Sequence, residues 1–202
     1  MCICCGLPFA SSHGSDHLCG ACESHPNHYD TARSVGCYAS SLRSVIHHYK
    51  YHTAAHLAAP LGRLMWHALG TYFQSADMDL VVPVPLHHRR LRSRGFNQSA
   101  LLLRQWSSLA SARGQQIDQP RIETGLLFRH RPTLAQTGLS KARRAENLRR
   151  AFSVCNKAAL KGKRVLLVDD VLTTGATANA CAHVLKRAGA VRVDVLTLAR
   201  AV

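Results

Sequence analysis

Residues 165–177 read Val-Leu-Leu-Val-Asp-Asp-Val-Leu-Thr-Thr-Gly-Ala-Thr. The four apolar residues at the start predict a strand that is buried on both faces, as in parallel sheets. Asp169 and Asp170 follow directly, at the carboxyl edge of the sheet, where open α/β folds bind their ligands. The stretch therefore predicts a parallel α/β sheet with two carboxylates at its binding edge.

The next residues, Thr173 to Thr177, predict a cradle for a phosphate group. A helix is expected over residues 176–188, so its unpaired backbone N–H groups and the positive end of its dipole lie at this turn. Gly175 and three threonine hydroxyls surround the same point. Because the carboxylates can accept hydrogen bonds from vicinal hydroxyls, the whole pattern predicts a site for a ribose 5-phosphate.

Strands and helices alternate around this stretch. Strand patterns cover residues 79–84, 164–169 and 191–198, with a strand-like centre at 126–128 in residues 121–131. Helical spacing of apolar residues begins near Leu42, near Pro60 and near Asn97, the last with a stripe at Leu101, Leu102, Trp106 and Leu109. Residues 85–95 are expected to be a basic loop, and residues 132–150 a mobile loop that runs into a basic helix. This alternation predicts a doubly wound parallel sheet.

Two Cys-x2-Cys pairs open the chain, at Cys2, Cys5, Cys19 and Cys22. Each pair can supply two thiolates from one tight turn, and four thiolates suit a structural zinc ion, Zn2+, that leaves no position for water. Unmetallated thiols are the alternative, but the first 30 residues hold few apolar side chains with which to fold alone. We therefore expect a zinc-finger module over residues 1–30, a linking strand and helical segment over 31–76 that packs on the main domain, and that main domain over 77–202.

The composition is strongly basic, with 26 Lys+Arg against 11 Asp+Glu in 202 residues and a formal charge of +15. Residues 81–160 hold 15 cations and three acids, which gives this stretch a net charge of +12. Such asymmetry suggests an anionic partner, either phosphate or nucleic acid. A solvated basic surface that only aids solubility is the alternative.

No apolar run approaches the roughly 18 residues that a membrane span needs. The first residues also lack the cationic and apolar regions of a secretory signal, so we expect a cytoplasmic protein. The chain contains neither a Walker A sequence nor Gly-x-Gly-x-x-Gly, which disfavours an ATPase or a dinucleotide oxidoreductase.

Residues 165–177 resemble the signature of type I phosphoribosyltransferases, which bind 5-phosphoribosyl 1-pyrophosphate (PRPP) with magnesium, Mg2+. Together with the cysteine pairs, the chain from Cys2 to Ala199 resembles the competence protein F (ComF) family. The other motifs that carry this resemblance are Tyr49-Lys50-Tyr51, Val82-Pro83-Val84-Pro85, Arg94-Gly95-Phe96-Asn97-Gln98, and Gln136-Thr137-Gly138-Leu139-Ser140 followed by Arg143 and Asn147. The resemblance implies a zinc finger before a phosphoribosyltransferase-like domain, which is a parallel sheet flanked by helices.

The resemblance also implies which residues bind PRPP or a related ribose phosphate. Asp169 and Asp170 would hold the ribose hydroxyls, Thr173 to Thr177 would hold the 5′-phosphate, and the loop after residue 84 would hold the pyrophosphate. The implied contacts are Asp169, Asp170, Val171, Leu172, Thr173, Thr174, Gly175, Ala176, Thr177, Pro85, Leu86, His87 and Arg89. Residues 131–144 would form a flexible loop that closes over the site. Lys141 on that loop, or the substrate itself, would supply acid–base catalysis beside the two carboxylates.

The family further implies a role in natural transformation, in which incoming single-stranded DNA is brought into the cytoplasm. The basic stretch is then expected to contact the DNA backbone through Arg89, Arg90, Arg92, Arg94, Arg143, Arg144, Arg149 and Arg150. Other DNA-uptake and recombination proteins would be partners. Two alternatives stay open: an active phosphoribosyltransferase of nucleotide salvage or related metabolism, and a PRPP-sensing regulator.

Overall fold

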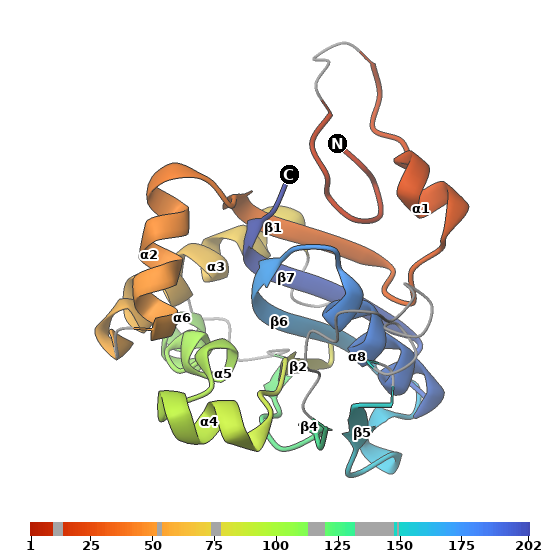
Figure 1. Ribbon diagram of the computed structural model, residues 1–202. Coiled ribbons are helices and arrows are strands. Elements are labelled where there is room, and N and C mark those ends of the chain that lie inside the picture. The colour runs from red at the N-terminus through yellow and green to blue at the C-terminus, as the bar shows by residue number, and fades with distance from the viewer. Residues whose placement is uncertain (10–13, 52–53, 74–77, 113–119, 132–147, 149) are drawn as a thin grey trace.

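A five-stranded parallel sheet organises the described part of the chain, in the order β1-β7-β6-β2-β3 (Figure 1). Its strands are β1 (Thr31–Cys37), β2 (Leu80–Pro83), β3 (Arg121–Ile122), β6 (Arg164–Leu172) and β7 (Arg192–Arg200). The computed structural model describes all residues except 10–13, 52–53, 74–77, 113–119, 132–147 and 149. The predicted parallel sheet flanked by helices is confirmed.

Helices cover both faces of this sheet. One face carries α2 (Ser40–Tyr51), α3 (Ala58–Tyr72), α5 (Gln98–Leu102) and α6 (Trp106–Ala112). The other carries α8 (Ala176–Arg187) and a hairpin of β4 (Leu127–Arg129) and β5 (Phe152–Val154). The other short helices of the described residues are α1 (Gly20–Ser24), η1 (Ala55–Leu57), α4 (His88–Arg94) and η3 (Ala158–Leu160).

The residues of β6 explain how the two cores form. Val165 and Leu167 pack on the face of α8, whereas Leu166 and Val168 pack on the face of α3 and α6. Successive side chains of a strand point to opposite faces, so an uninterrupted apolar run must be covered on both sides. The strand continues to Leu172, three residues beyond the predicted 164–169, because its last residues still pair with β7.

Residues 85–95 are not a loop throughout, and that prediction was wrong. The Nδ1 atom of His87 accepts a hydrogen bond from the N–H of Arg89 at 3.3 Å and caps α4. At the other end, Gly95 has a φ of 79° and donates its N–H to the carbonyl of Leu91 at 2.8 Å. Arginine is a good helix former, and this left-handed glycine is a common helix stop. The segment has no apolar stripe, which is why helical spacing did not reveal it.

Two further segments differ from their expected form. The helix expected from Asn97 is divided, since Leu103 and Arg104 donate their N–H groups three residues back and tighten the chain between α5 and α6. The strand expected within residues 121–131 is two strands. Its first part joins the main sheet as β3, and its second part pairs antiparallel with β5.

The amino-terminal module leads directly into the sheet. The N–H of Ala32 donates to the carbonyl of Cys4 at 2.7 Å, and β1 then pairs with β7 from Thr31 to Cys37. Residues 31–37 therefore form an edge strand of the main sheet. Within the described residues, every helix is too short or too polar to cross a membrane.

Candidate functional site

The turn between β6 and α8 lies at the carboxyl edge of the sheet, where the sequence predicts the phosphate cradle. Gly175 has a φ of 76°, a left-handed conformation that glycine adopts without a steric penalty. The N–H of Ala176 donates to Oγ1 of Thr174 at 3.4 Å. Thr173, Thr174 and Ala176 are exposed, so the start of a 12-residue helix faces outward here. This geometry suits an anion.

The neighbouring residues of β6 contribute differently. Leu172 is buried and Val171 is half-buried, and both pair with β7. Their side chains pack in the two cores. Thr177 is half-buried in the first turn of α8. Of the predicted loop residues, Thr173, Thr174 and Ala176 are therefore open to a ligand, whereas Gly175 is buried.

The two carboxylates have unlike surroundings. Asp170 is buried and accepts hydrogen bonds from Nζ of Lys50 and Nε2 of Gln98, both at 2.8 Å. Asp169 is half-buried and its Oδ1 accepts from Oγ of Ser99 and from the N–H of Asp170, both at 2.9 Å. Burial, and next the charge of Asp170, raise the pKa of Asp169 to about 7. Asp169 can therefore exchange a proton near neutral pH.

Lys50 and Gln98 come from the motifs Tyr49-Lys50-Tyr51 and Arg94-Gly95-Phe96-Asn97-Gln98, and Ser99 directly follows the second motif. Asn97 caps α5, because its Oδ1 accepts from the N–H of Ser99 at 3.0 Å. Its Nδ2 donates to the carbonyl of Val84 at 3.2 Å, and the hydroxyl of Tyr49 donates to the carbonyl of Gln98 at 2.7 Å. Our reading of the sequence gave no role to Lys50, Gln98 or Ser99. A lysine next to a buried tyrosine, and an Asn-Gln pair at a helix start, were the available signals.

The predicted pyrophosphate loop begins where β2 ends. Val84 continues the pairing with β6, since its N–H donates to the carbonyl of Val168 at 2.8 Å. Pro85 and Leu86 are half-buried, and His87 is buried at the start of α4. Burial, followed by the charges of neighbouring cations, lowers the pKa of His87. The loop thus follows β2, which is the neighbour of β6, and begins at the same edge of the sheet as the two carboxylates.

Arg129 on β4 is a cation of this region to which the sequence analysis assigned no role. Its guanidinium lies 5.4 Å from the centre of the Phe152 ring. Its charge lowers the pKa of His87, and the charge of Asp169 acts on Arg129 in turn. Arg129 therefore stands near both the carboxylates and the loop after β2.

The cations predicted to contact nucleic acid are only partly described. Arg89, Arg90 and Arg92 are exposed on α4, and the guanidinium of Arg94 lies 4.9 Å from the centre of the Tyr51 ring. Arg150 is exposed as well. Lys141 and the arginines Arg143, Arg144 and Arg149 lie outside the described residues, as does most of the loop expected over 131–144.

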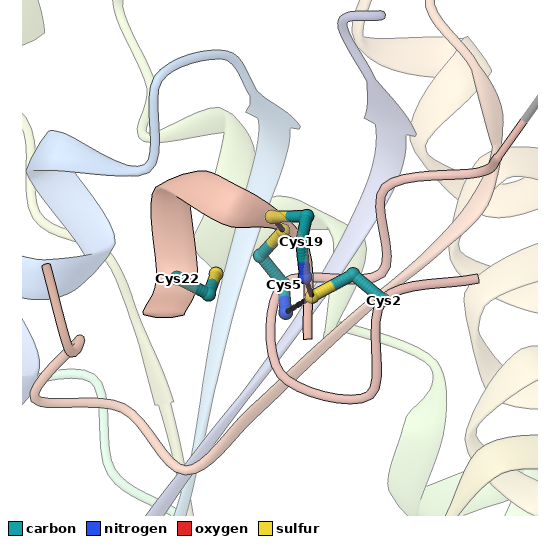
Figure 2. A group of neighbouring side chains, drawn as sticks. All are labelled: Cys2, Cys5, Cys19 and Cys22. Carbon is teal, nitrogen blue, oxygen red and sulfur yellow. Dashed lines mark hydrogen bonds between the residues drawn. The ribbon is translucent and has the colours of Figure 1, made fainter. Parts of the chain in front are cut away.

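The four predicted zinc ligands converge, as Figure 2 shows. The sulfur atoms of Cys2, Cys5, Cys19 and Cys22 all lie within 4.8 Å of one another, and those of Cys5 and Cys19 are 3.7 Å apart. Zn–S bonds of about 2.3 Å in a tetrahedron place sulfur atoms about 3.8 Å apart, so the cluster fits such an ion. Cys2 Sγ also accepts the N–H groups of Cys19 and Cys5, at 3.3 and 3.5 Å. This cluster can hold a metal ion.

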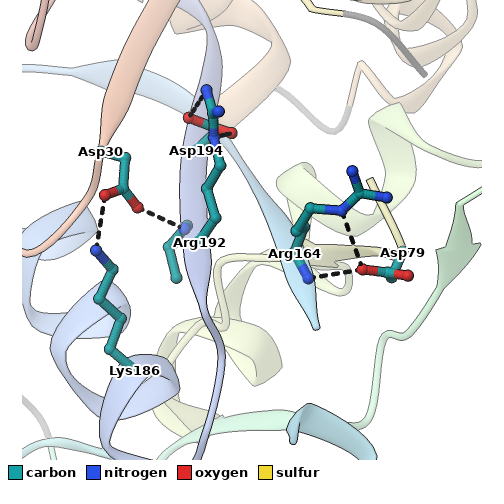
Figure 3. Close-up of polar contacts among 7 residues, drawn as sticks. Asp30, Asp79, Arg164, Lys186, Arg192 and Asp194 are labelled. Carbon is teal, nitrogen blue, oxygen red and sulfur yellow. Dashed lines mark hydrogen bonds and ion pairs between the residues drawn. The ribbon is translucent and has the colours of Figure 1, made fainter. Parts of the chain in front are cut away.

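Several other acids serve the fold at the opposite edge of the sheet (Figure 3). Asp79 accepts the N–H of Arg164 at 2.8 Å, and this hydrogen bond is the main cause that lowers the pKa of Asp79. Asp30 pairs with Lys186 at 2.8 Å, and Arg192 pairs with Asp194. These acids lie just before or near the amino ends of strands, whereas Asp169 and Asp170 lie near the carboxyl end of β6.

The similarity of the chain to known proteins agrees with this geometry. Residues 128–201 match the phosphoribosyl transferase domain family. The chain is 32% identical to competence protein F of Haemophilus influenzae over 204 residues, which cover 96% of this chain and 86% of that protein. It is 34% identical to DNA utilization protein YhgH of Escherichia coli K12 over 212 residues, which cover 99% of this chain and 84% of that protein.

A solved structure of glutamine PRPP amidotransferase from B. subtilis, complexed with ADP and GMP, aligns with a TM-score of 0.42 and 23% identity. The alignment covers 72% of this chain and 26% of that chain. Competence protein F and YhgH, in contrast, match this chain nearly from end to end. This chain belongs to the family of competence protein F and DNA utilization protein YhgH.

Proposed function

We propose that this chain binds PRPP or a related ribose phosphate at the turn after β6, and that it acts in the cytoplasm in the uptake or handling of incoming single-stranded DNA. The observation that carries the first part is the turn after β6, where Thr173, Thr174 and Ala176 are exposed four to seven residues after Asp169 and Gly175 has a left-handed conformation. The names of the relatives support the second part, since they speak of competence and of DNA utilization.

In this proposal each part of the site takes one part of the ligand. The backbone N–H groups and hydroxyls of Thr173 to Thr177 bind the 5′-phosphate. Asp169 accepts hydrogen bonds from the ribose hydroxyls, while Asp170, held by Lys50, fixes the position of the end of β6. Pro85, Leu86, His87 and Arg89, with Arg129 nearby, form the pyrophosphate side. Mg2+ bound with PRPP would offset the charge of the pyrophosphate, and Asp169 offers an oxygen ligand of the kind that this ion prefers.

The DNA-binding surface that we propose is the exposed side of α4. Arg89, Arg90 and Arg92 project from it, and it contains no acidic residue. Backbone phosphates need cations of this kind and no particular sequence. The zinc-loaded cysteine module would serve as a structural support beside the sheet.

Calorimetric titration with PRPP and Mg2+ tests the ligand. We expect the wild-type protein to bind, and Asp169→Asn to weaken binding at least tenfold, because the hydrogen bonds from the ribose hydroxyls are weaker to a neutral amide. Asp79→Asn is the matched control, since Asp79 lies at the opposite edge of the sheet. Equal affinities for Asp169→Asn and wild type, or no binding by the wild type, would refute the assignment.

An active phosphoribosyltransferase is the second candidate, and the raised pKa of Asp169 favours it. A carboxyl with a pKa of about 7 can take up or release a proton during catalysis near neutral pH. Release of pyrophosphate from PRPP in the presence of nitrogenous bases measures this activity. Turnover that disappears in Asp169→Asn supports catalysis. Binding of PRPP without turnover for any base would favour binding or sensing instead.

A further inference from the structure

Arg200 joins the cysteine cluster to the phosphate-binding turn. It is the last residue of β7 and pairs with Leu172 of β6 on one side. Its Nη1 atom donates to the carbonyl of Thr173 at 3.2 Å, and its Nη2 atom donates to Sγ of Cys5 at 3.6 Å. One half-buried guanidinium thus contacts both the proposed ligand site and a cysteine of the metal cluster.

A second connection runs from the cluster to the same turn. Nδ2 of Asn27 donates to Sγ of Cys22 at 3.4 Å. Two residues later, Tyr29 is buried, and its hydroxyl lies against Gly175, where an added Cβ would be 3.1 Å from the hydroxyl oxygen. The cysteine module therefore packs against the glycine whose left-handed conformation shapes the turn.

The contact with Thr173 has a direct effect on the orientation of the turn. In a trans peptide the C=O of one residue and the N–H of the next point in opposite directions. By holding the carbonyl of Thr173, Arg200 fixes the peptide plane and directs the N–H of Thr174 to the side away from itself. That N–H is one of the donors proposed for the 5′-phosphate.

The other end of Arg200 depends on the state of the cluster. A metal ion would fix the position of the Cys5 sulfur, which accepts the hydrogen bond from the guanidinium. Residues that donate to ligand atoms in this way orient the ligands, and they also strengthen metal binding. The position of Arg200 should therefore differ between the metal-loaded and the metal-free protein.

We infer that Arg200 is a positioning residue that couples metal in the four-cysteine cluster to the geometry of the phosphate-binding turn. The loaded cluster holds Arg200, and Arg200 holds the peptide between Thr173 and Thr174. By thermodynamic linkage, a ligand on the turn raises the affinity of the cluster for metal by the same factor by which metal raises the affinity for ligand. This ligand-dependent part rests on the proposed function, whereas the coupling to the free turn does not.

Hydrogen exchange measured by mass spectrometry tests the coupling without any ligand. The proteins are wild type, Arg200→Gln and Arg200→Lys, each loaded with zinc and after treatment with a chelator. The control is Arg33→Gln, because Arg33 donates to the carbonyls of Ile3 and Ala32, at 3.1 and 2.8 Å, and both carbonyls lie outside the turn. Peptides from the centres of β6 and β7 report whether the sheet stays folded.

We expect zinc-loaded Arg200→Gln to exchange the amides of residues 173–177 at least about fivefold faster than wild type, with Arg200→Lys in between. Chelation should accelerate the same amides in wild type and in Arg33→Gln, and should accelerate them less in Arg200→Gln, where the contact through Tyr29 remains but that of Arg200 is lost. The inference is wrong if zinc-loaded Arg200→Gln exchanges this turn like wild type. It is also wrong if chelation accelerates the exchange of the turn equally in wild type and in Arg200→Gln while the amides of the sheet stay protected. If chelation unfolds the sheet, the comparison of zinc-loaded proteins decides alone.

Competition with a coloured chelator gives a second readout, the affinity for zinc. Loss of the donor to Cys5 should lower this affinity about tenfold in Arg200→Gln and leave it unchanged in Arg33→Gln. Saturating PRPP should then raise the zinc affinity of wild type more than that of Arg200→Gln. If PRPP does not bind the wild type, the proposed ligand is wrong, while the exchange experiment still supports or overturns the coupling.

Discussion

Lys50→Met removes one partner of a buried ion pair, and the structure gives the expected size of the effect. The side chain of Lys50 is 17% exposed and that of Asp170 is 6% exposed. Leaving one member of such a pair uncompensated costs about 3–5 kcal/mol. Because Gln98 still donates to Asp170, we take the lower end, about 3 kcal/mol of the free energy of unfolding. For 202 residues at about 2.1 cal/mol/K each, this corresponds to a melting temperature about 7 °C lower.

Thermal unfolding of the zinc-loaded protein, followed by circular dichroism, measures this shift. Lys186→Met is the matched control, because Lys186 also pairs with an aspartate at 2.8 Å, but both side chains are about one-third exposed. It should cost at most about 1 kcal/mol. The double variant Lys50→Met with Asp170→Asn should lose less than the sum of its single variants, since it leaves no buried charge unpaired. Equal losses for Lys50→Met and Lys186→Met would refute the reasoning.

Three other predictions concern pH, packing and DNA. The pKa of Asp169 is raised from 3.8 to about 7, so between these pH values the folded protein holds a proton that the unfolded chain releases. This proton stabilises the folded state fully below about pH 4, and the stabilisation is lost as the pH rises through about 7. Urea unfolding should show this loss in the wild type but not in Asp169→Asn. In α3, Gly62→Ala should lower the free energy of unfolding, measured by urea, by about 1–3 kcal/mol or more, because the added Cβ would lie 2.3 Å from a carbonyl oxygen of α5. The exposed Gly70→Ala in the same helix should raise it by up to about 1 kcal/mol. For single-stranded DNA, fluorescence anisotropy at several salt concentrations should show that Arg89→Gln with Arg92→Gln lowers the salt slope by about 1.4, and an unchanged slope would exclude α4 as the binding surface.

The elements that the sequence predicts well are those whose pattern is local. The apolar run before Asp169 identifies β6, the turn around Gly175 identifies the start of α8, and the Cys-x2-Cys spacing identifies a cluster that the structure brings together. The division of the chain into residues 1–30, 31–76 and 77–202, and the roles of the site residues, stay proposals.

The contacts that shape the site could not be predicted in this way, because they join residues far apart in the chain. Lys50 and Asp170 are separated by 120 positions, and Cys5 and Arg200 by 195. Periodicity says which face a residue occupies but not which residue it will meet. The helix α4 was not predicted for a different reason. Its arginine-rich segment has no apolar stripe, and its ends are marked only by the caps at His87 and Gly95.

The edge strand β1 has a consequence for the order in which the protein is made. Residues 31–37 of β1 pair with residues 194–200 of β7. During synthesis β1 is therefore made long before the strand with which it pairs. Contacts between such distant segments close large loops and slow folding. The cysteine module precedes β1, so it too is made long before β7. Until β7 is made, β1 lacks its only partner strand in the described sheet, and its unpaired backbone N–H and C=O groups are open to pairing with other chains.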